Sequence, residues 1–315
     1  MSADVGRDGT LSFVHAADLH LDSPFTGISG IDPELGERLA KATFQAYETI
    51  IELCMAEEVD FLLIAGDVYD SADKSLYAQV KFIEGLRKLE TAGIQVFICH
   101  GNHDPIDGWS ASLKWPGNVH VMSGDGAEAV EFKKEGKTAA VIVGMSYPEQ
   151  HITKNLVRDF QKKDDDWPFT IGLLHCSVGS NPEHAPYAPC TLQDLRETGY
   201  DYWALGHIHT PSIVCKEAPV VIYPGNPQGR HPGELGERGC CLVDVSSGGA
   251  VSTRFIETDS VRWHIREISI EGLEKEGELI EELQNQLDDI RENVGGRSVI
   301  CRLVLSGRGP LHHTI

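Results

Sequence analysis

Short apolar runs that alternate with longer helical segments are the feature that most constrains how this chain can fold. Apolar side chains recur at helical spacing in residues 33–58 and 76–92. Around them lie continuously apolar runs, as expected of buried strands: 11–17, 60–65, 94–99, 138–144, 169–175 and 202–206. This alternation predicts an α/β domain with helices outside its sheets. After residue 201 the pattern changes to short strands and turns: 212–216, 220–223, 239–245 and 251–256.

A second unit begins near residue 259, with a predicted order of strand 263–270, helix 273–293 and strand 298–305. The apolar stripe of the helix fits packing on its own sheet or a coiled coil with a partner: Leu273, Ile280, Leu283, Leu287 and Ile290. One βαβ unit is a small core. We therefore expect a partial capping domain over 259–315 that belongs to a longer natural domain, behind a catalytic domain over 11–258 and a flexible tail over 1–10.

The charge of the chain bears on its partners. The formal net charge is −21, which argues against nonspecific binding of a polyanion by the surface as a whole. Residues 271–292 hold nine acidic and two basic residues, so this segment supplies −7 of the total. An enzyme can still bind a phosphate chain through metal ions and a local groove, and DNA therefore stays a candidate substrate.

The apolar runs and the cysteines indicate in which cellular compartment the protein is expected. The apolar runs fall short of the ~18 residues that a membrane-spanning helix needs, and the polar start lacks the pattern of a signal peptide. We expect a cytoplasmic protein without a membrane partner. The eight cysteines form no C-x-x-C pair, so we expect reduced, mostly buried thiols. Cys240 and Cys241 are successive strand residues and should point to opposite faces.

Polar side chains that bind metals follow five of the predicted strands. The segments at these strand ends share Asp, His or Asn: Asp18-Leu19-His20, Gly66-Asp67-Val68-Tyr69-Asp70, Gly101-Asn102-His103-Asp104, His175 and Gly206-His207-Ile208-His209. Ligands of open α/β sheets bind at the carboxyl ends of the strands. We therefore expect these side chains to meet at one edge of the fold.

The types of these side chains predict a dinuclear metal site. Carboxylate, imidazole and amide donors without a thiolate suit divalent ions of hard or intermediate character. Two ions about 3.5–4 Å apart need one shared carboxylate and roughly three further ligands each. Asp67 fits the shared position. The other six predicted ligands form two sets of three: Asp18, His20 and His209 for the first ion, and Asn102, His175 and His207 for the second.

Each motif taken alone has an ordinary structural explanation. Asp18-x-His20 is common in loops, Gly66-Asp67 can cap a helix, and 206–209 can be a turn. Together, in this order and each at a strand end, the motifs favour the metal site.

Glycines and further histidines add to this prediction. Gly66, Gly101 and Gly206 would let backbone segments approach one another closely. Among the remaining histidines, His184 and His231 lie in loops that could border the site.

The five motifs together resemble the calcineurin-like metallophosphoesterase family. Within it, two blocks are similar to the bacterial SbcD-type and YhaO-like DNA-repair exonucleases. The first block is Phe13-Val14-His15-Ala16-Ala17-Asp18-Leu19-His20-Leu21-Asp22. The second is Tyr223-Pro224-Gly225-Asn226-Pro227-Gln228-Gly229-Arg230, followed by Glu237-Arg238-Gly239. General phosphatases of the family do not usually carry the second block.

The resemblance implies a four-layer αββα sandwich of two mixed sheets, with a small capping domain after the catalytic one. It also implies two divalent ions, usually Mn²⁺, an SbcC-like or YhaN-like ATPase as partner, and the homodimers that are frequent in the family. The chain departs from the pattern in its acidity and at Cys176, where many relatives have a small residue. That thiol is either a weak extra ligand or a packed side chain.

The expected mechanism is attack on phosphorus by a metal-bound hydroxide. His103 would donate a proton to the leaving oxygen or stabilise its charge. Asp70 would accept a hydrogen bond from the other ring nitrogen of His103 and fix its tautomer. Arg230 would pair with a substrate phosphate or form a surface ion pair.

Three functions follow from the sequence. A Mn²⁺-dependent DNA exonuclease of DNA repair predicts cleavage of DNA and an apolar, ATPase-facing surface beyond residue 260. A phosphatase or phosphodiesterase for small molecules predicts a narrow pocket, and the acidic surface favours it. A non-catalytic binding protein is the third, and the complete ligand set argues against it because buried carboxylates and imidazoles without metal are costly.

Overall fold

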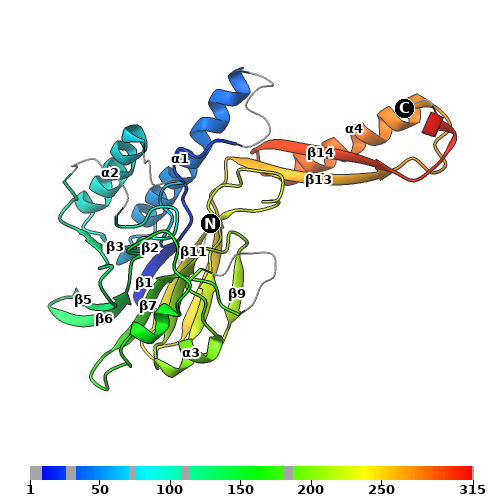
Figure 1. The fold of residues 1–315 in the computed structure, drawn as a ribbon. Coiled ribbons are helices and arrows are strands. Elements are labelled where there is room, and N and C mark those ends of the chain that lie inside the picture. Colours follow the sequence, from blue (N-terminus) through cyan, green and yellow to red (C-terminus); the bar gives the residue numbers. More distant parts are fainter. Residues whose placement is uncertain (1–8, 26–32, 71–74, 108–113, 180–186, 314–315) are drawn as a thin grey trace.

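Two six-stranded mixed sheets form the body of the protein. The computed structural model describes residues 9–25, 33–70, 75–107, 114–179 and 187–313 (Figure 1). The first sheet has the order β12-β11-β1-β2-β3-β4. Its strands are β1 (Gly9–Ala16), β2 (Phe61–Ala65), β3 (Gln95–Cys99), β4 (Val119–Val121), β11 (Gly239–Ser246) and β12 (Val251–Glu257). β1 to β4 are parallel, while β11 pairs antiparallel with β1 and β12.

The second sheet has the order β5-β6-β7-β8-β10-β9. Its strands are β5 (Glu128–Lys134), β6 (Lys137–Gly144), β7 (Phe169–His175), β8 (Tyr202–Gly206), β9 (Ser212–Cys215) and β10 (Val220–Tyr223). The four central strands are parallel and the two edge strands pair antiparallel. The predicted pair of mixed sheets is therefore confirmed.

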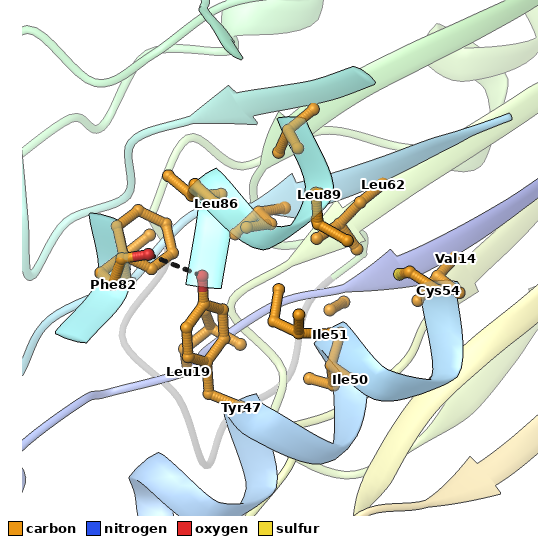
Figure 2. Packing of buried hydrophobic residues seen from close by; sticks show 14 of the residues in the cluster. Val14, Leu19, Tyr47, Ile50, Ile51, Cys54, Leu62, Phe82, Leu86 and Leu89 are labelled. Atoms are coloured by element: carbon orange, nitrogen blue, oxygen red, sulfur yellow. Dashed lines mark hydrogen bonds between the residues drawn. The ribbon is translucent and has the colours of Figure 1, made fainter. Parts of the chain in front are cut away.

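Apolar clusters on both sides of the first sheet hold the layers together. One cluster packs α1 (Pro33–Ala56) and α2 (Leu76–Thr91) on its outer face, where Tyr47 donates a hydrogen bond to Phe82 O, 2.9 Å (Figure 2). Another fills the space between the two sheets, with Phe13 stacked on Phe61 at 5.0 Å. Cys240 lies in the first cluster and Cys241 in the second, so the two thiols face opposite sides, as predicted.

The outer layer of the second sheet is thin. It contains α3 (Leu192–Glu197), a 3-10 turn at Leu156–Asp159 and loops around Trp203. The sequence patterns did not predict α3, β4 or β5. Strand β5 is an edge strand whose side chains are mostly charged and solvent-exposed, so it lacks an apolar signal. Strand β1 begins at Gly9, and residues 1–8 lie outside the described part, so the flexible tail over 1–10 stays a prediction.

A separate arm extends away from the two sheets (Figure 1). It consists of β13 (Val261–Ser269), α4 (Glu276–Asn293) and β14 (Ser298–Ser306), and its two strands are parallel. The base of the arm is fixed by the block 223–230: Gln228 Nε2 donates to Val261 O, 2.6 Å, and Trp263 Nε1 donates to Gly229 O, 3.1 Å.

Helix α4 packs on the sheet of the arm, which was one of the two predicted alternatives. Leu273 and Leu283 join its apolar cluster, and Ile290 is buried. The stripe is not buried throughout, because Ile280 and Leu287 are 54% and 38% exposed. Among the described helices, none combines the length and the apolar character that crossing a membrane requires.

Candidate metal centre

The carboxyl ends of five strands meet at one edge of the two sheets, which we call the metal edge. The loops after β1 and β2 are joined by a hydrogen bond from Asp18 N to Gly66 O, 3.0 Å. The two sheets are joined here as well, because His175 Nδ1 at the end of β7 donates to Ala65 O at the end of β2, 3.0 Å. Residues far apart in sequence therefore share one small volume.

Four side chains form a first candidate metal position. His20 Nε2 lies 3.2 Å from His209 Nε2, and His209 Nε2 lies 3.8 Å from Asp18 Oδ1. Asp67 Oδ2 lies 3.9 Å from His20 Nε2. Ligand atoms that are about 2.0–2.2 Å from a shared ion lie about 3–4 Å from one another. The distances therefore fit one divalent ion.

A second candidate position lies beside the first. His175 Nε2 is 3.0 Å from Asn102 Oδ1 and 3.3 Å from Asp67 Oδ2. The ring of His207 lies against that of His175, with centroids 5.2 Å apart. All seven predicted ligands thus come together, and the set that they form is nitrogen- and oxygen-based, as a divalent ion requires.

Asp67 lies between the two positions. Its Oδ2 faces His20 of the first set and His175 of the second, at 3.9 and 3.3 Å. Its Oδ1 accepts a hydrogen bond from His103 N, 2.9 Å. One oxygen is therefore fixed by the backbone while the other lies where a bridging ligand is needed.

Three of the four histidines use Nδ1 for a protein contact, which leaves Nε2 for a metal ion. His20 Nδ1 lies 3.0 Å from Asp70 Oδ1, and His209 Nδ1 lies 2.6 Å from Glu234 Oε1. His175 uses the backbone carbonyl described above. Metal-binding histidines usually donate their other ring N–H to a carboxylate or carbonyl in this way. The residues present therefore fit divalent metal ions.

The backbone at the metal edge is strained. Four of the seven predicted ligands have φ in the left-handed region: Asp18 (53°), His20 (43°), Asp67 (51°) and His207 (100°). Such a conformation costs about 1–3 kcal/mol for a residue other than glycine and persists only where the surroundings hold it. Strain of this kind concentrates at functional sites.

The predicted glycines make this close packing possible. A side chain at Gly206 would overlap Ala65 O, and one at Gly101 would overlap the Asp67 carboxylate. Gly66 has a φ of 86°, which side-chain-bearing residues rarely adopt. The prediction that these three glycines allow close approach is confirmed.

A cavity of about 420 Å³ opens at the metal edge. The residues that line it include Asp67, Asn102, His103, His207, His209 and His231. His231 therefore borders the site, as expected from its loop. His184 lies outside the described residues.

Comparison with known proteins agrees with this geometry. Residues 11–211 match the calcineurin-like phosphoesterase family. The chain belongs to this family. Residues 263–315, which include most of the arm, match the middle domain of metallophosphoesterase YhaO.

Several relatives of this phosphoesterase cover much of the chain. "Uncharacterized metallophosphoesterase YhaO" of Bacillus subtilis (strain 168) is 39% identical over 300 residues, 95% of this chain and 72% of that protein. The DNA double-strand break repair protein Mre11 of Aeropyrum pernix is 27% identical, over 67% of this chain and 52% of that protein. A component of the SbcCD nuclease of Bacillus subtilis is 21% identical, over 76% of this chain and 67% of that protein. The chain thus spans about half the length of the Aeropyrum protein.

Burial and charge pairing shape the protonation of the phosphoesterase site. Burial alone raises the pKa of Asp67, but His175 and His20 beside it outweigh this effect and hold the pKa well below its usual range. Burial lowers the pKa of His175, but the Asp67 and Asp18 carboxylates raise it to about 9. Burial lowers the pKa of His20 to about 3, and the Arg230 guanidinium adds to this effect. The carboxylates therefore favour positive charge at the metal edge, which divalent ions would supply.

Asp70 and Arg230 have contacts that the sequence predicted only in part. Asp70 accepts from His103 Nδ1, 2.8 Å, but it does so through its backbone carbonyl, and its carboxylate lies beside His20 instead. Arg230 is 8% exposed and donates to Asp70 Oδ1, 2.7 Å. The structure thus shows the ion-pair alternative for Arg230, in a buried form; contact with a substrate phosphate stays a prediction. Cys176 Sγ lies 3.8 Å from Cys190 Sγ in an apolar cluster, as a packed side chain.

Two buried carboxylates that support the site were not predicted from the sequence. Asp104 accepts from Val68 N, 2.9 Å, and from Gly101 N, 2.8 Å, so it joins the loops that carry Asp67 and Asn102. Its place in the motif 101–104 was the available signal. Glu234 contacts His209 from a loop 25 residues farther along the chain, and its surroundings in sequence gave no sign of this role.

Proposed function

We propose that this phosphoesterase hydrolyses phosphodiester bonds of DNA with two divalent metal ions, of which Mn²⁺ is the activating species. The meeting of the seven predicted ligands at the metal edge, with Asp67 Oδ2 facing His20 of one set and His175 of the other, carries the proposal. Two such ions, when bound, hold the phosphate oxygens, lower the pKa of a water and neutralise charge in the transition state.

His103 is the proposed proton donor to the leaving oxygen. It lines the cavity and lies next to Asn102, but its backbone N–H is used by Asp67 and its Nδ1 by Asp70 O. A carbonyl oxygen can only accept, so Nδ1 carries a proton and the ring is fixed in orientation. To act as the general acid, the ring would carry a second proton on Nε2 and give it to the leaving oxygen, while Nδ1 keeps its proton on Asp70 O.

DNA is the proposed substrate because relatives named as DNA repair protein Mre11 and as part of a nuclease share this chain's body at 27% and 21% identity. A small-molecule phosphodiesterase is the second candidate, and the net charge of −21 favours it, since an acidic surface repels a polyanion. Both candidate functions use the same metal edge, and they differ in the substrate that the surface around this edge would accept.

An SbcC-like or YhaN-like ATPase and a second copy of the chain remain proposed partners. The DNA nuclease hypothesis predicted apolar surface beyond residue 260. The arm does expose large apolar side chains there: Ile265, Ile280, Leu287, Val304 and Leu305. A sizing experiment with light scattering, alone and with the ATPase, tests both partners.

A nuclease assay decides between the two substrates. End-labelled single- and double-stranded DNA are incubated with the purified chain and Mn²⁺, Mg²⁺ or Zn²⁺, beside bis(p-nitrophenyl) phosphate as a small diester. Cleavage of DNA that requires Mn²⁺ and is lost in Asp67→Asn supports the proposal. Turnover of the small ester while DNA stays intact would replace it with the second candidate.

A further inference from the structure

A buried carboxylate outside the ligand set contacts the first metal position. Glu234 lies in the loop between β10 and β11, and its side chain is 4% exposed. A buried carboxylate is costly unless it is paired and hydrogen-bonded. Its Oε1 lies 2.6 Å from His209 Nδ1 and 3.4 Å from His231 Nε2, and its Oε2 accepts from Arg230 N, 2.7 Å.

A second carboxylate makes the corresponding contact with the other histidine of the first position. Asp70 Oδ1 lies 3.0 Å from His20 Nδ1, at ion-pair distance, whereas Glu234 Oε1 is hydrogen-bonded to His209 Nδ1, 2.6 Å away. The Nε2 atoms of the two rings then lie 3.2 Å apart, within reach of a single ion. Each histidine of this position is therefore held from behind by an anion.

The Arg230 guanidinium connects the two carboxylates. Its Nη1 donates to Asp70 Oδ1, 2.7 Å, and to Ser23 Oγ, 3.0 Å, while its Nη2 lies 3.5 Å from Glu234 Oε1. A planar guanidinium can serve two carboxylates at once in a fixed geometry, which a lysine cannot. The positive charge also offsets the repulsion between two anions in a buried place.

At the second metal position, the nearest partner of His175 Nδ1 is the neutral carbonyl of Ala65, 3.0 Å away, and the Asp18 carboxylate is farther, at 4.0 Å. The main support of the His175 ring therefore comes from the backbone. His175 differs in this respect from His20 and His209, whose Nδ1 atoms lie nearest to carboxylates.

We propose that Glu234 is a positioning residue of the metal centre, and that Asp70, Arg230 and Glu234 form a clamp that holds the first metal position. The inference rests on the proposed dinuclear centre and adds a specific dependence to it. Removing the clamp should weaken one of the two ions and leave the other in place. Partners behind metal-binding histidines typically change metal affinity about 10–100-fold when they are removed.

Metal titration of the full chain tests the clamp. The protein is stripped with a chelator and titrated with MnCl₂ in a calorimeter, with metal content measured separately by mass spectrometry. The wild type should bind two Mn²⁺ per chain. Glu234→Ala should bind one ion with wild-type affinity and the other about 10–100-fold more weakly. Asp70→Asn should weaken the same ion.

A spectroscopic readout separates loss of one position from a general loss of structure. Electron paramagnetic resonance should show coupled Mn²⁺ pairs in the wild type and isolated Mn²⁺ ions in Glu234→Ala at equal metal loading. Glu237→Gln is the matched control, because Glu237 lies in the same loop with a side chain that is 61% exposed and that faces Arg262, 3.9 Å away, instead of a histidine. It should bind two ions like the wild type.

Conservative variants keep the test decisive if Glu234→Ala fails to fold. Glu234→Gln keeps the size and an acceptor oxygen but removes the negative charge. Arg230→Lys keeps the positive charge but loses the planar set of N–H donors that can serve two carboxylates. Both should weaken one ion by a smaller factor. Wild-type affinity for two ions in folded Glu234 and Arg230 variants would overturn the clamp alone. A wild-type chain that binds no Mn²⁺ would overturn the dinuclear centre and the clamp with it.

Discussion

The metal edge and the arm differ in how tightly their residues are held. At the metal edge, Asp18, His20 and His175 are fully buried and each has several partners. In the arm, Ile280 and Val304 are 54% and 40% exposed. The contrast extends to glycine: Gly206 has no room for a methyl group, while Gly277 in α4 has nothing within 4 Å.

This difference shows where several independent contacts hold the same side chains in place. At the metal edge, four ligands have left-handed backbone, and glycines pack against the side chains of Asp67 and His175. The arm needs only its apolar cluster and its base contacts. Substitutions at the metal edge should therefore act strongly and specifically, while those in the arm should act weakly.

The largest effect is expected from Asp67→Asn. The amide keeps the size but removes the charge that two ions share, so bound Mn²⁺ should fall from two per chain towards zero. The hydrolysis rate should fall on the order of 10³-fold or more, because several kcal/mol of transition-state stabilisation are lost. Metal analysis and hydrolysis of a chromogenic diester measure both. Asp289→Asn in the arm, where the carboxylate is 61% exposed, is the control and should change neither; retention of both ions by the Asp67 variant would refute the bridge.

His103→Ala should come next. The rate should fall about 10²–10⁴-fold, the usual range for loss of a general acid, with metal content unchanged. Metal analysis beside steady-state kinetics separates the two readouts. If metal and activity fall together, His103 supports the metal site instead of donating a proton. His120→Ala, on edge strand β4 with a side chain that is 40% exposed, is the matched control.

The sequence predicted the metal edge better than its supporting contacts. Continuously apolar strands such as β2 and β7 can be located from the sequence alone. The residues that follow them can then be assigned to the ligand-binding edge, because ligands of open α/β sheets bind at the carboxyl ends of the strands. Local spacing carried this information, so the seven predicted ligands could be chosen without coordinates. The alternation of strands and helices predicted an α/β domain with helices outside its sheets, and the family resemblance implied the four αββα layers.

Contacts between distant loops could not be predicted in this way. Glu234 meets His209 only because the loop after β10 folds back over the end of β8, which depends on tertiary packing. Asp70 reaches His103 with a backbone oxygen, a choice that depends on local dihedral angles. Strand β5 carries its charges on an exposed edge and gave no apolar signal.

Gly206→Ala should destabilise the fold by about 2–3 kcal/mol, the cost of overpacking a site that cannot expand. Its new methyl group would meet Ala65 O and the His175 ring, and both are fixed parts of the metal edge. Urea unfolding measures the loss. A variant as stable as the wild type would show that β2 and β8 can separate, and would remove the claim that several independent contacts hold this edge in place.

The pH dependence of stability should come from the body more than from the arm. Burial lowers the pKa of His15 in β1 from 6.5 to about 3, and its Nδ1 lies 3.0 Å from Tyr202 Oη. Between these values the unfolded chain binds the extra proton, so stability is present above pH 6.5 and is lost as the pH falls towards 3. The loss is about 1.4 kcal/mol per pH unit, or about 2 kcal/mol at about pH 5. In urea unfolding at several pH values, His15→Gln should reduce the dependence of the unfolding free energy on pH. His264→Gln in the arm is the control and should leave most of this dependence. An equal pH dependence in the wild type and in His15→Gln would contradict the assignment to His15.

The smallest effect, with the opposite sign, is expected from Gly277→Ala in α4. A methyl group there meets no atom within 4 Å, and alanine has less backbone freedom to lose when the helix forms. The variant should be more stable than the wild type by about 0.5 kcal/mol, measured by the same urea unfolding as Gly206→Ala. The chemical change is identical in the two variants, so the comparison sets the lack of space around Gly206 against the gain in helix stability at Gly277, where space is free. Destabilisation by Gly277→Ala would mean that the arm is packed as tightly as the metal edge, and the comparison between the two regions would lose its physical basis.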